Sequence, residues 1–428
     1  MRILIVGSGG REHAITWALR HTSPEELDIF CAPGNAGIAR DALQVPCSVD
    51  DHAALIDFAR AENIDLTFVG PEAPLADGLV DKFEATGLQI VGPTQSAARL
   101  EASKVFAKKF MSRHGVPTAT FRIADSPAEA IRFIRSGEFG SSDQPVVIKA
   151  DGLAAGKGVI VASSGTEAEA AIDNLMIKKS VGPQAAERVL IEEALSGEEA
   201  SVLLFSDGRD YVLMPPARDH KRIGEGDTGP NTGGMGSVTD PSVIDDATLE
   251  QVIHQIIEPS LDGADREGFK FRGVLFLGLM LTKDGPKLLE YNVRFGDPET
   301  QAILIRLRTD LVAIFRAIRE GSLARLKVEW SAGSSACVVA ANRGYPGTYE
   351  KGGVIQGLED AGDVQVFHAG TSVSAEGRLI ATGGRVLGVT AAAANLSSAL
   401  NHCYRALQKI HWEGMQYRRD IGRRAAAV

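Results

Sequence analysis

Three polar residues alternate along one stretch of the chain: Glu290, Asn292 and Arg294. Residues two apart on a β-strand point to the same face, so a strand here would present a carboxylate, an amide and a guanidinium together. Carboxylate and amide oxygens suit a hard cation such as magnesium, and an arginine beside them can hold phosphate oxygens. A polar strand edge is the weaker alternative. The spacing therefore predicts a metal and phosphate site.

A second candidate site is the segment 146–162, VVIKADGLAAGKGVIVA, in which two β-branched runs bracket a glycine-rich turn. We predict a hairpin whose glycine amides and ammonium groups hold a polyphosphate, using Lys149, Gly152, Gly156, Lys157 and Gly158. It is not a Walker A loop, because a strand follows where that loop requires a helix. A mobile hairpin with two solvated lysines is the alternative.

Two more stretches carry unusual polar patterns. The segment 215–240 holds six glycines and the basic cluster Arg218-Asp-His-Lys-Arg222, with no helix or strand period. Long segments of this kind are functional or disordered, and the absence of repeats favours function. In segment 189–201 two acidic pairs flank an apolar turn. They indicate either a nucleotide seat or a solvated strand edge.

The first hundred residues alternate strand and helix patterns, which predicts a parallel sheet covered on both faces. Its ligand-side loops would be 7–13, 32–37 and 69–74. The first loop lacks the third glycine of a dinucleotide-binding motif, because Glu12 stands there. A single phosphate held by Gly9, Gly10 and the helix that follows is the better interpretation, with a simple tight turn as the alternative.

Length and composition set limits on these hypotheses. A chain of 428 residues predicts about three domains. The net charge of −10 argues against binding to nucleic acid or to an anionic membrane. Four scattered cysteines have no metal-binding spacing, and no signal peptide or long apolar run is present. We therefore expect a cytoplasmic protein with reduced thiols.

Several elements are expected between and beyond these motifs. Continuous helices are predicted over 75–86, 94–114 and 392–410. Asp297 is expected to cap a helix with Pro298 at its first position. Fresh strands after Ser331 indicate a C-terminal unit that adds loops to the same cleft.

Taken in order, these motifs resemble the ATP-grasp superfamily and, within it, the phosphoribosylamine–glycine ligase family. The matching stretches cover nearly the whole chain: GxGGREH at Gly7, APGNAG at Ala32, VGPEAPL at Val69, VIKADGLAAGKGV at Val147, DHKR at Asp219, DTGPNTGGMG at Asp227, NxRFGDPETQ at Asn292, GYPG at Gly344 and FHAGT at Phe367. Each motif alone is weak, but together in this order they are highly specific.

The resemblance implies an α/β protein with the ATP-grasp fold. It implies an N-terminal parallel-sheet (pre-ATP-grasp) domain over 1–103 and an ATP-grasp domain over 104–330. A small mobile lid would be inserted at about 121–193, and a C-terminal domain would cover 331–428. A monomer or weak homodimer is expected.

The resemblance further implies a reaction in purine biosynthesis. ATP would phosphorylate glycine to glycyl phosphate, and 5-phosphoribosylamine would attack it, giving glycinamide ribonucleotide, ADP and phosphate. Magnesium would be the metal ion, with manganese as the alternative. A related ligase acting on another acid, or a nucleotide-binding module without turnover, are the competing hypotheses.

Residue roles follow from the same resemblance. ATP would contact Lys104, Lys149, Gly152, Gly156, Lys157, Gly158, Glu192, Glu193, Leu195 and Glu199. The other substrates would contact Gly9, Gly10, Asn35, Glu72, Asp219 and Arg294. Glu290 and Asn292 would hold the metal, and catalysis would involve Arg294, Lys149, Asp219 and Lys221. The strand 273–281 lacks the carboxylate that many relatives place there, so a second ion has no identified ligand besides Glu290.

Overall fold

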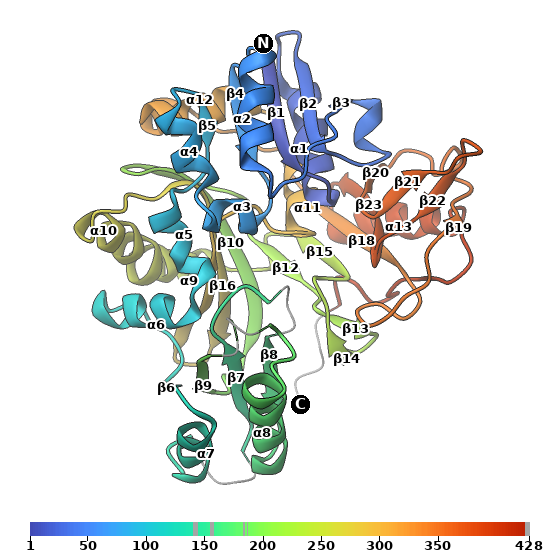
Figure 1. Cartoon of the computed structure of the whole chain (residues 1–428). Helices are drawn as coiled ribbons and strands as arrows, with labels where there is room; N and C mark the ends of the chain where they lie inside the picture. Colours follow the sequence, from blue (N-terminus) through green and yellow to red (C-terminus); the bar gives the residue numbers. More distant parts are fainter. Residues whose placement is uncertain (140–143, 155–157, 183–184, 186, 424–428) are drawn as a thin grey trace.

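The computed structural model describes residues 1–139, 144–154, 158–182, 185 and 187–423. Figure 1 shows an N-terminal sheet at the top, a small α/β unit at the bottom and the C-terminal strands at the right. A large central sheet joins them. No described helix is long and apolar enough to cross a membrane.

The N-terminal sheet is parallel throughout, with strand order β3-β2-β1-β4-β5, as predicted. Its strands are β1 (Arg2–Gly7), β2 (Asp28–Pro33), β3 (Leu43–Gln44), β4 (Leu66–Val69) and β5 (Ile90–Val91). The helical elements are α1 (Gly10–Thr22), η1 (Ile38–Arg40), α2 (His52–Ala61), α3 (Glu72–Ala76) and α4 (Leu79–Ala85). The Asp51 side chain accepts a hydrogen bond from the Ala54 amide and caps α2, as expected.

Two helices expected to be continuous are each broken. The segment 75–86 divides between α3 and α4, because Gly78 adopts a left-handed conformation with φ of 75°. The segment 94–114 divides into α5 (Gln95–Ala102) and α6 (Lys104–Arg113). Ser103 breaks it, because its hydroxyl caps α6 through the Phe106 amide and also donates to Asp151.

The central sheet has the order β17-β16-β10-β12-β15-β18-β23-β20, with antiparallel neighbours. Its strands before residue 300 are β10 (Glu198–Asp207), β11 (Tyr211–Leu213), β12 (Ala217–Asp219), β15 (Gly236–Thr239), β16 (Arg272–Thr282) and β17 (Gly285–Asn292). The side chains of β16 alternate between two cores. Leu275 and Leu277 belong to one core, and Val274 and Phe276 belong to the other.

The segment 215–240 is more regular than predicted. It contains β12, the hairpin β13 (Arg222–Gly224) and β14 (Thr228–Asn231), and β15. The prediction of no strands here was wrong because these strands have only three or four residues, too few to show a period of two.

Helices cover both faces of the central sheet. They are α9 (Asp246–Val252), α10 (Glu258–Arg266), α11 (Glu299–Leu304) and α12 (Leu311–Glu320), with the π-helix η3 (Ile253–Ile257) and the 3-10 helix η4 (Leu323–Arg325). Asp297 does not cap α11, because Pro298 occupies the N-cap position. The carboxylate of Asp297 instead accepts a hydrogen bond from Gln301 and pairs with Arg385.

The lower α/β unit in Figure 1 has its own four-stranded sheet, in the order β6-β9-β7-β8. Its elements are β6 (Phe121–Ala124), α7 (Pro127–Arg135), β7 (Val146–Ala150), β8 (Val159–Ala162), α8 (Gly165–Ile172), η2 (Asp173–Ile177) and β9 (Val189–Glu193). The β7–β8 pairing is antiparallel, which confirms the predicted hairpin. The mobility of this unit and the domain boundaries stay predictions.

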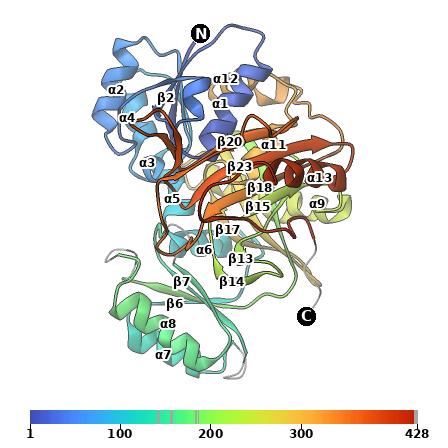
Figure 2. The same ribbon diagram turned by 90° about the vertical axis from the view of Figure 1, so that its right-hand side faces the viewer.

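The strands after residue 331 extend the central sheet, because β18 pairs with the free edge of β15. The C-terminal elements are β18 (Ser334–Asn342), β19 (Gly353–Val354), β20 (Gln365–His368), β21 (Thr371–Val373), β22 (Leu379–Ala381), β23 (Arg385–Ala393), α13 (Leu396–Leu407) and β24 (Met415–Gln416). Helix α13 packs on β18 and β23 (Figure 2). The predicted helix 392–410 is shorter than expected: it begins at Leu396, because β23 continues through Ala393 and Asn395 caps the helix, and it ends at Leu407.

The last described turn of the chain is fastened to the hairpin β13–β14. Arg418 is 2% exposed and donates to the carboxylates of Asp227 and Asp420 and to the carbonyl of Arg222. Asp420 in turn accepts from the Gly226 amide at 2.8 Å. We call these contacts the tail clasp; it ties the C-terminus to a segment that lines the site described next.

Candidate functional site

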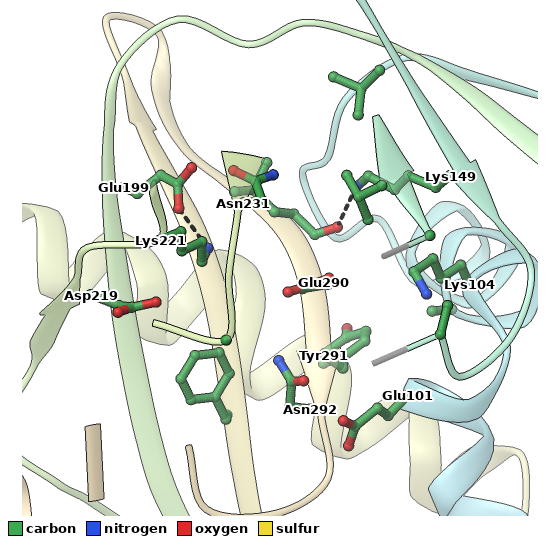
Figure 3. A pocket seen from close by; sticks show the side chains of 18 of the residues that line it. Glu101, Lys104, Lys149, Glu199, Asp219, Lys221, Asn231, Glu290, Tyr291 and Asn292 are labelled. Atoms are coloured by element: carbon green, nitrogen blue, oxygen red, sulfur yellow. Dashed lines mark hydrogen bonds and ion pairs between the residues drawn. The ribbon is translucent and has the colours of Figure 1, made fainter. Parts of the chain in front are cut away.

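A cavity of about 680 Å³ opens between the lower α/β unit, the central sheet and the N-terminal sheet. Figure 3 shows its polar lining: Lys104 and Lys149 on one side, Glu290 and Asn292 in the middle, and Asp219 and Lys221 on the other side. Most residues predicted for the site line it: Glu72, Lys104, Lys149, Gly158, Glu192, Glu193, Leu195, Glu199, Asp219, Lys221, Glu290, Asn292 and Arg294.

A buried cluster of lysines surrounds Glu192, which is 1% exposed at the end of β9. Its Oε2 lies 3.0 Å from Lys149 Nζ and 3.1 Å from Lys108 Nζ, while its Oε1 is buried without a partner. Lys104 Nζ donates to the Gly152 carbonyl at 2.9 Å. Burial lowers the pKa of Lys104 and brings that of Lys108 to about 8. This side of the cavity therefore offers closely packed cationic groups.

The chain after β9 forms the next part of the wall. Glu193, Ala194 and Leu195 line the cavity, and Glu193 Oε1 accepts from the Thr120 amide at 2.8 Å. Glu199, at the start of β10, pairs with Lys221 Nζ at 2.5 Å. The predicted nucleotide seat at 192–199 therefore faces the cavity, although Glu198 and Glu199 are also exposed to solvent, and its contact with a nucleotide stays a prediction.

Glu290 lies in the middle of the cavity with its charge open to a ligand. Among the residues that the structure describes, none makes a hydrogen bond or ion pair to its carboxylate. Burial would raise the pKa of Glu290, but Lys221, Lys149 and Lys104 lower it below the ordinary value. The carboxylate is therefore ionised and able to accept a cation.

The donor set around Glu290 fits a divalent metal ion. Asn292 presents its amide oxygen on the same strand, where it accepts one hydrogen bond from Arg294 Nη2 at 3.1 Å and keeps a second lone pair. One carboxylate and one amide oxygen are hard ligands of the kind magnesium takes. No group of three or more His, Cys, Asp or Glu side chains arranged for a metal exists within the described part of the chain. Further ligands must come from phosphate oxygens or water.

Arg294, just after β17, links this strand to helices α3 and α5. Its guanidinium pairs with Glu72 at 3.1 Å and with Glu101 at 3.0 Å, and Glu101 also accepts from the Val293 amide. Burial would raise the pKa of Glu72, but Arg294 and Arg11 lower it to about 2. The predicted arginine is therefore fixed in place by two carboxylates.

The opposite end of the cavity is closed by the C-terminal strands. Arg385 donates to the carbonyls of Gly233 and Asp297, and the Tyr345 hydroxyl accepts from the Gly233 amide at 2.9 Å. Asp219 also lines this end. The expectation that C-terminal loops reach the same cleft is confirmed through Tyr345 and Arg385.

Three residues predicted to contact substrate do not line the cavity: Gly9, Gly10 and Asn35. The carboxylate of Glu12 accepts from the Gly9 amide at 2.6 Å, so this side chain occupies the place where a phosphate was expected. Asn35 donates to the carbonyls of Ser8 and His368 and accepts from two amides. Their substrate contacts stay predictions.

The structure describes only part of the glycine turn 152–158. Gly158 lines the cavity, and Gly152 reaches it only through the bond from Lys104. Gly156 and Lys157 lie outside the described residues.

Sequence reasoning missed several polar residues of the lining: Arg11, Glu101, Lys108, Asn231, Asp297, Glu299, Tyr345 and Arg385. Lys108 could have been found, since it follows Lys104 by one helical turn and therefore shares its face. Tyr345 lies in the GYPG motif and Arg385 lies among the C-terminal strands that were expected to add loops to the cleft, but only the pairing of β15 with β18 brings them here. No local pattern indicates that pairing.

Comparison with known proteins shows which family has this arrangement of domains. Three family models of phosphoribosylglycinamide synthetase match the chain: the N domain at residues 1–101, the ATP-grasp (A) domain at 102–300 and the C domain at 335–424. A phosphoribosylamine–glycine ligase of Caldanaerobacter subterraneus is 47% identical over 98% of this chain and 99% of its own. The enzyme of that name from Escherichia coli O6:H1 is 47% identical over 99% of both chains.

Solved structures agree. The crystal structure of a Thermotoga maritima phosphoribosylamine–glycine ligase has a TM-score of 0.84 and 35% identity, and covers 98% of this chain and all of its own. The biotin carboxylase domain of a Hydrogenobacter thermophilus 2-oxoglutarate carboxylase shares the fold alone, with a TM-score of 0.72 and 16% identity over 97% of this chain and 91% of its own.

The fold and the cavity are those of an ATP-grasp protein, an ATP-dependent ligase that uses a divalent metal ion. The chain belongs to the phosphoribosylglycinamide synthetase family. The predicted fold, family and enzyme class are confirmed.

Proposed function

We propose that this chain uses ATP to ligate glycine to 5-phosphoribosylamine, through a glycyl phosphate intermediate, giving glycinamide ribonucleotide, ADP and phosphate. The observation that carries the proposal is Glu290, an ionised carboxylate without a protein partner among the described residues, set among Lys104, Lys149, Lys221 and Arg294. The names of relatives that align over nearly the whole chain supply the identity of the substrates.

ATP would lie between the lower α/β unit and the central sheet. The segment 193–195 would meet the adenine, and Glu199 would accept the ribose hydroxyls. Lys104 and Lys149, held by a carbonyl and by Glu192, would contact the phosphates. The hairpin β7–β8 would close over the nucleotide and keep water from the acyl phosphate.

Glu290 and Asn292 would hold the metal ion, for which we propose magnesium, with manganese as the alternative. When bound, such an ion neutralises phosphate oxygens and lowers the barrier to their attack by a nucleophile. The protein residues do the positioning. Arg294 is held in place by Glu72 and Glu101, and its guanidinium would stabilise the transferring phosphoryl group.

The chemical sequence has two steps. A carboxylate oxygen of glycine attacks the γ-phosphorus of ATP, the bond from that phosphorus to the bridging oxygen of ADP breaks, and glycyl phosphate forms. The amine of phosphoribosylamine then attacks the carbonyl carbon, phosphate leaves, and the amine loses one proton. Burial would lower the pKa of Lys221, but Glu199 and Glu290 raise it above the ordinary value, so this side chain stays charged near the reacting carboxyl.

An isotope experiment tests the proposal. Glycine labelled with ¹⁸O in its carboxylate, incubated with the protein, ATP, magnesium and phosphoribosylamine, should pass one labelled oxygen to the released phosphate. Release of ADP should require glycine. ADP release that ignores glycine, or phosphate without label, would exclude this reaction and favour a ligase acting on another acid.

We also propose a cytoplasmic location and no binding to nucleic acid or membrane, supported by the net charge of −10 and by four cysteines that are all free. Monomer or weak homodimer stays our prediction for the assembly.

A further inference from the structure

The hairpin β13–β14 is a separate two-stranded sheet without a hydrophobic core of its own. It spans residues 222–231, all of which the structure describes, and none of them belongs to a hydrophobic cluster of the molecule. A two-stranded hairpin alone is marginally stable at best in water. Contacts from elsewhere in the chain must therefore hold it in place.

The tail clasp supplies these contacts. Arg418 Nη1 donates to the carbonyl of Arg222 at 3.0 Å and to the carboxylate of Asp227 at 2.7 Å. Asp420 accepts from Arg418 and from the Gly226 amide, and so joins the two. The clasp therefore holds both the first strand of the hairpin and its turn.

Lys221 lies between two residues that the C-terminal segment holds. His220, which is 4% exposed, accepts with its Nε2 from the Gly422 amide at 3.1 Å. Arg222, on the other side, has its carbonyl in the clasp. The side chain of Lys221 lines the cavity, where its Nζ pairs with Glu199 at 2.5 Å (Figure 3). The C-terminal segment therefore fixes the backbone on both sides of this lysine.

The chain after the hairpin carries the same connection into the cavity wall. The amide and the hydroxyl of Thr232 each donate to the Lys221 carbonyl at 2.8 Å. Asn231, the last residue of β14, lines the cavity together with Thr232 and Gly233. A displacement of the hairpin would therefore displace Lys221 and this part of the lining together.

Arg418 is suited to fix a geometry more than to add stability. Its side chain is 2% exposed, and Arg418 is not one of the residues that line the cavity. A buried charge network adds little net stability compared with apolar side chains of the same size, because every ion loses its hydration. A guanidinium, however, fixes the direction of several acceptors at once through its planar set of N–H donors.

We propose that Arg418 is a positioning residue for Lys221. The inference rests on the proposed function, in which Lys221 stays charged near the reacting carboxyl, and deepens it. Arg418 touches no substrate, and no bond forms or breaks at its side chain. It holds the hairpin so that Lys221 Nζ stays where negative charge develops during phosphoryl transfer.

A double-mutant cycle tests this inference, with kcat expressed per folded molecule. In Arg418→Met we expect kcat to fall roughly 30-fold, because misplacing a catalytic group by one ångström can cost about 100-fold. Lys221→Met alone should lower kcat about 100-fold, as for loss of one charge-stabilising donor. The double variant should be less than about twofold slower than Lys221→Met, because Arg418 then has no lysine left to position.

Two further measurements separate positioning from stability. The KM for ATP should rise less than about threefold in Arg418→Met, because Lys104 and Lys149 lie on the opposite side of the cavity (Figure 3). Arg418→Lys keeps the charge without the planar set of donors, and should restore kcat to within about tenfold of normal. A purely structural role would change the stability of these variants and leave kcat per folded molecule unchanged.

Arg306→Met is the matched control. Arg306 is also a buried arginine, 9% exposed, and donates to the Ser331 carbonyl and the Thr239 hydroxyl. Neither partner belongs to the hairpin β13–β14. This variant should lose stability, as Arg418→Met does, but its kcat per folded molecule should change less than about twofold.

A kcat within about twofold of normal in folded Arg418→Met would overturn the inference. Effects that multiply in the double variant would also overturn it, because they would show that Arg418 acts independently of Lys221. If Arg418→Met does not fold, Arg418→Lys decides by the same cycle. Failure of the proposed function is a separate result, because it appears in the unmodified protein as ADP release that does not depend on glycine.

Discussion

The N-terminal loop 7–13 and the segment 219–236 both combine glycines with arginine and histidine, but their polar groups end in different places. In the N-terminal loop the Gly9 amide is taken by Glu12, and Asn35 and His368 close the surroundings with further hydrogen bonds. In the other segment Asp219 faces the cavity with an oxygen that has no partner among the described residues.

This difference separates stability from activity. A polar group with all its bonds inside the protein contributes to folding, and its loss leaves buried partners unsatisfied. A polar group without a protein partner costs folding energy and can offset that cost only when a ligand binds. Substitutions should therefore affect stability in the first region and turnover in the second.

The largest effect is expected from Glu290→Gln, because Glu290 is a cavity residue whose carboxylate has no partner among the described residues. The variant keeps the shape of the side chain but removes the charge that would hold the metal. We expect kcat to fall at least about 1000-fold, as for loss of a principal electrostatic group in a transition state. Steady-state kinetics measures this, and circular dichroism should show an unchanged fold. Near-normal turnover would remove the metal assignment.

Asn35→Ala tests the N-terminal region, where the polar groups are bonded within the protein. Four hydrogen bonds to Asn35 would be lost, and we expect unfolding free energy to fall by about 3 kcal/mol. Urea denaturation measures this. Activity of the remaining folded protein should stay within about tenfold of normal. A much larger loss in kcat/KM for phosphoribosylamine, with normal stability, would instead support substrate contact at Asn35.

His368→Gln sharpens the comparison through pH. Burial, with the charges of His13 and Arg40, lowers the pKa of His368 to about 3, from an ordinary value of 6.5. Below pH 6.5 the unfolded chain therefore binds a proton at His368 that the folded protein does not bind until about pH 3. The free energy of unfolding falls as the pH drops from about 6.5 to about 3.

Between about pH 7 and pH 5 the unmodified protein should lose about 2 kcal/mol more than the His368→Gln variant. Thermal and urea unfolding across this range measure the difference. Parallel pH profiles for the two proteins would show that His368 is not held neutral by the fold. His13 is also buried, and because its charge helps to lower the pKa of His368 the two groups titrate as a coupled pair.

Ser103→Ala gives the smallest expected effect. Ser103 caps α6, which carries Lys104 and Lys108, and its hydroxyl also donates to Asp151. Loss of the cap should cost about 1 kcal/mol of stability, measured by urea denaturation, and change the KM for ATP slightly. The matched control is Ser103→Thr, because this substitution keeps the hydroxyl. Equal stability of both variants would contradict the capping role.

Much of the fold and of the candidate site could be predicted from the sequence, because residue periodicity and local chemistry determine these features. The parallel N-terminal sheet, the β7–β8 hairpin and the shared face of Glu290 and Asn292 all follow from patterns of a few residues. The breaks at Gly78 and Ser103 could not be predicted, since each depends on a tertiary contact or a single backbone torsion. Arg385 reaches the cavity because β15 pairs with β18, two strands that lie almost a hundred residues apart in the sequence.

The tail clasp has a practical consequence for anyone who shortens or extends this polypeptide. A truncation that removes Arg418 would release the hairpin β13–β14 and with it part of the cavity wall, and it would also remove Ile421 from the C-terminal hydrophobic core. A purification tag is therefore safer after Gly422 than in place of it, because Ile421 is buried in that core and the Gly422 amide donates to His220.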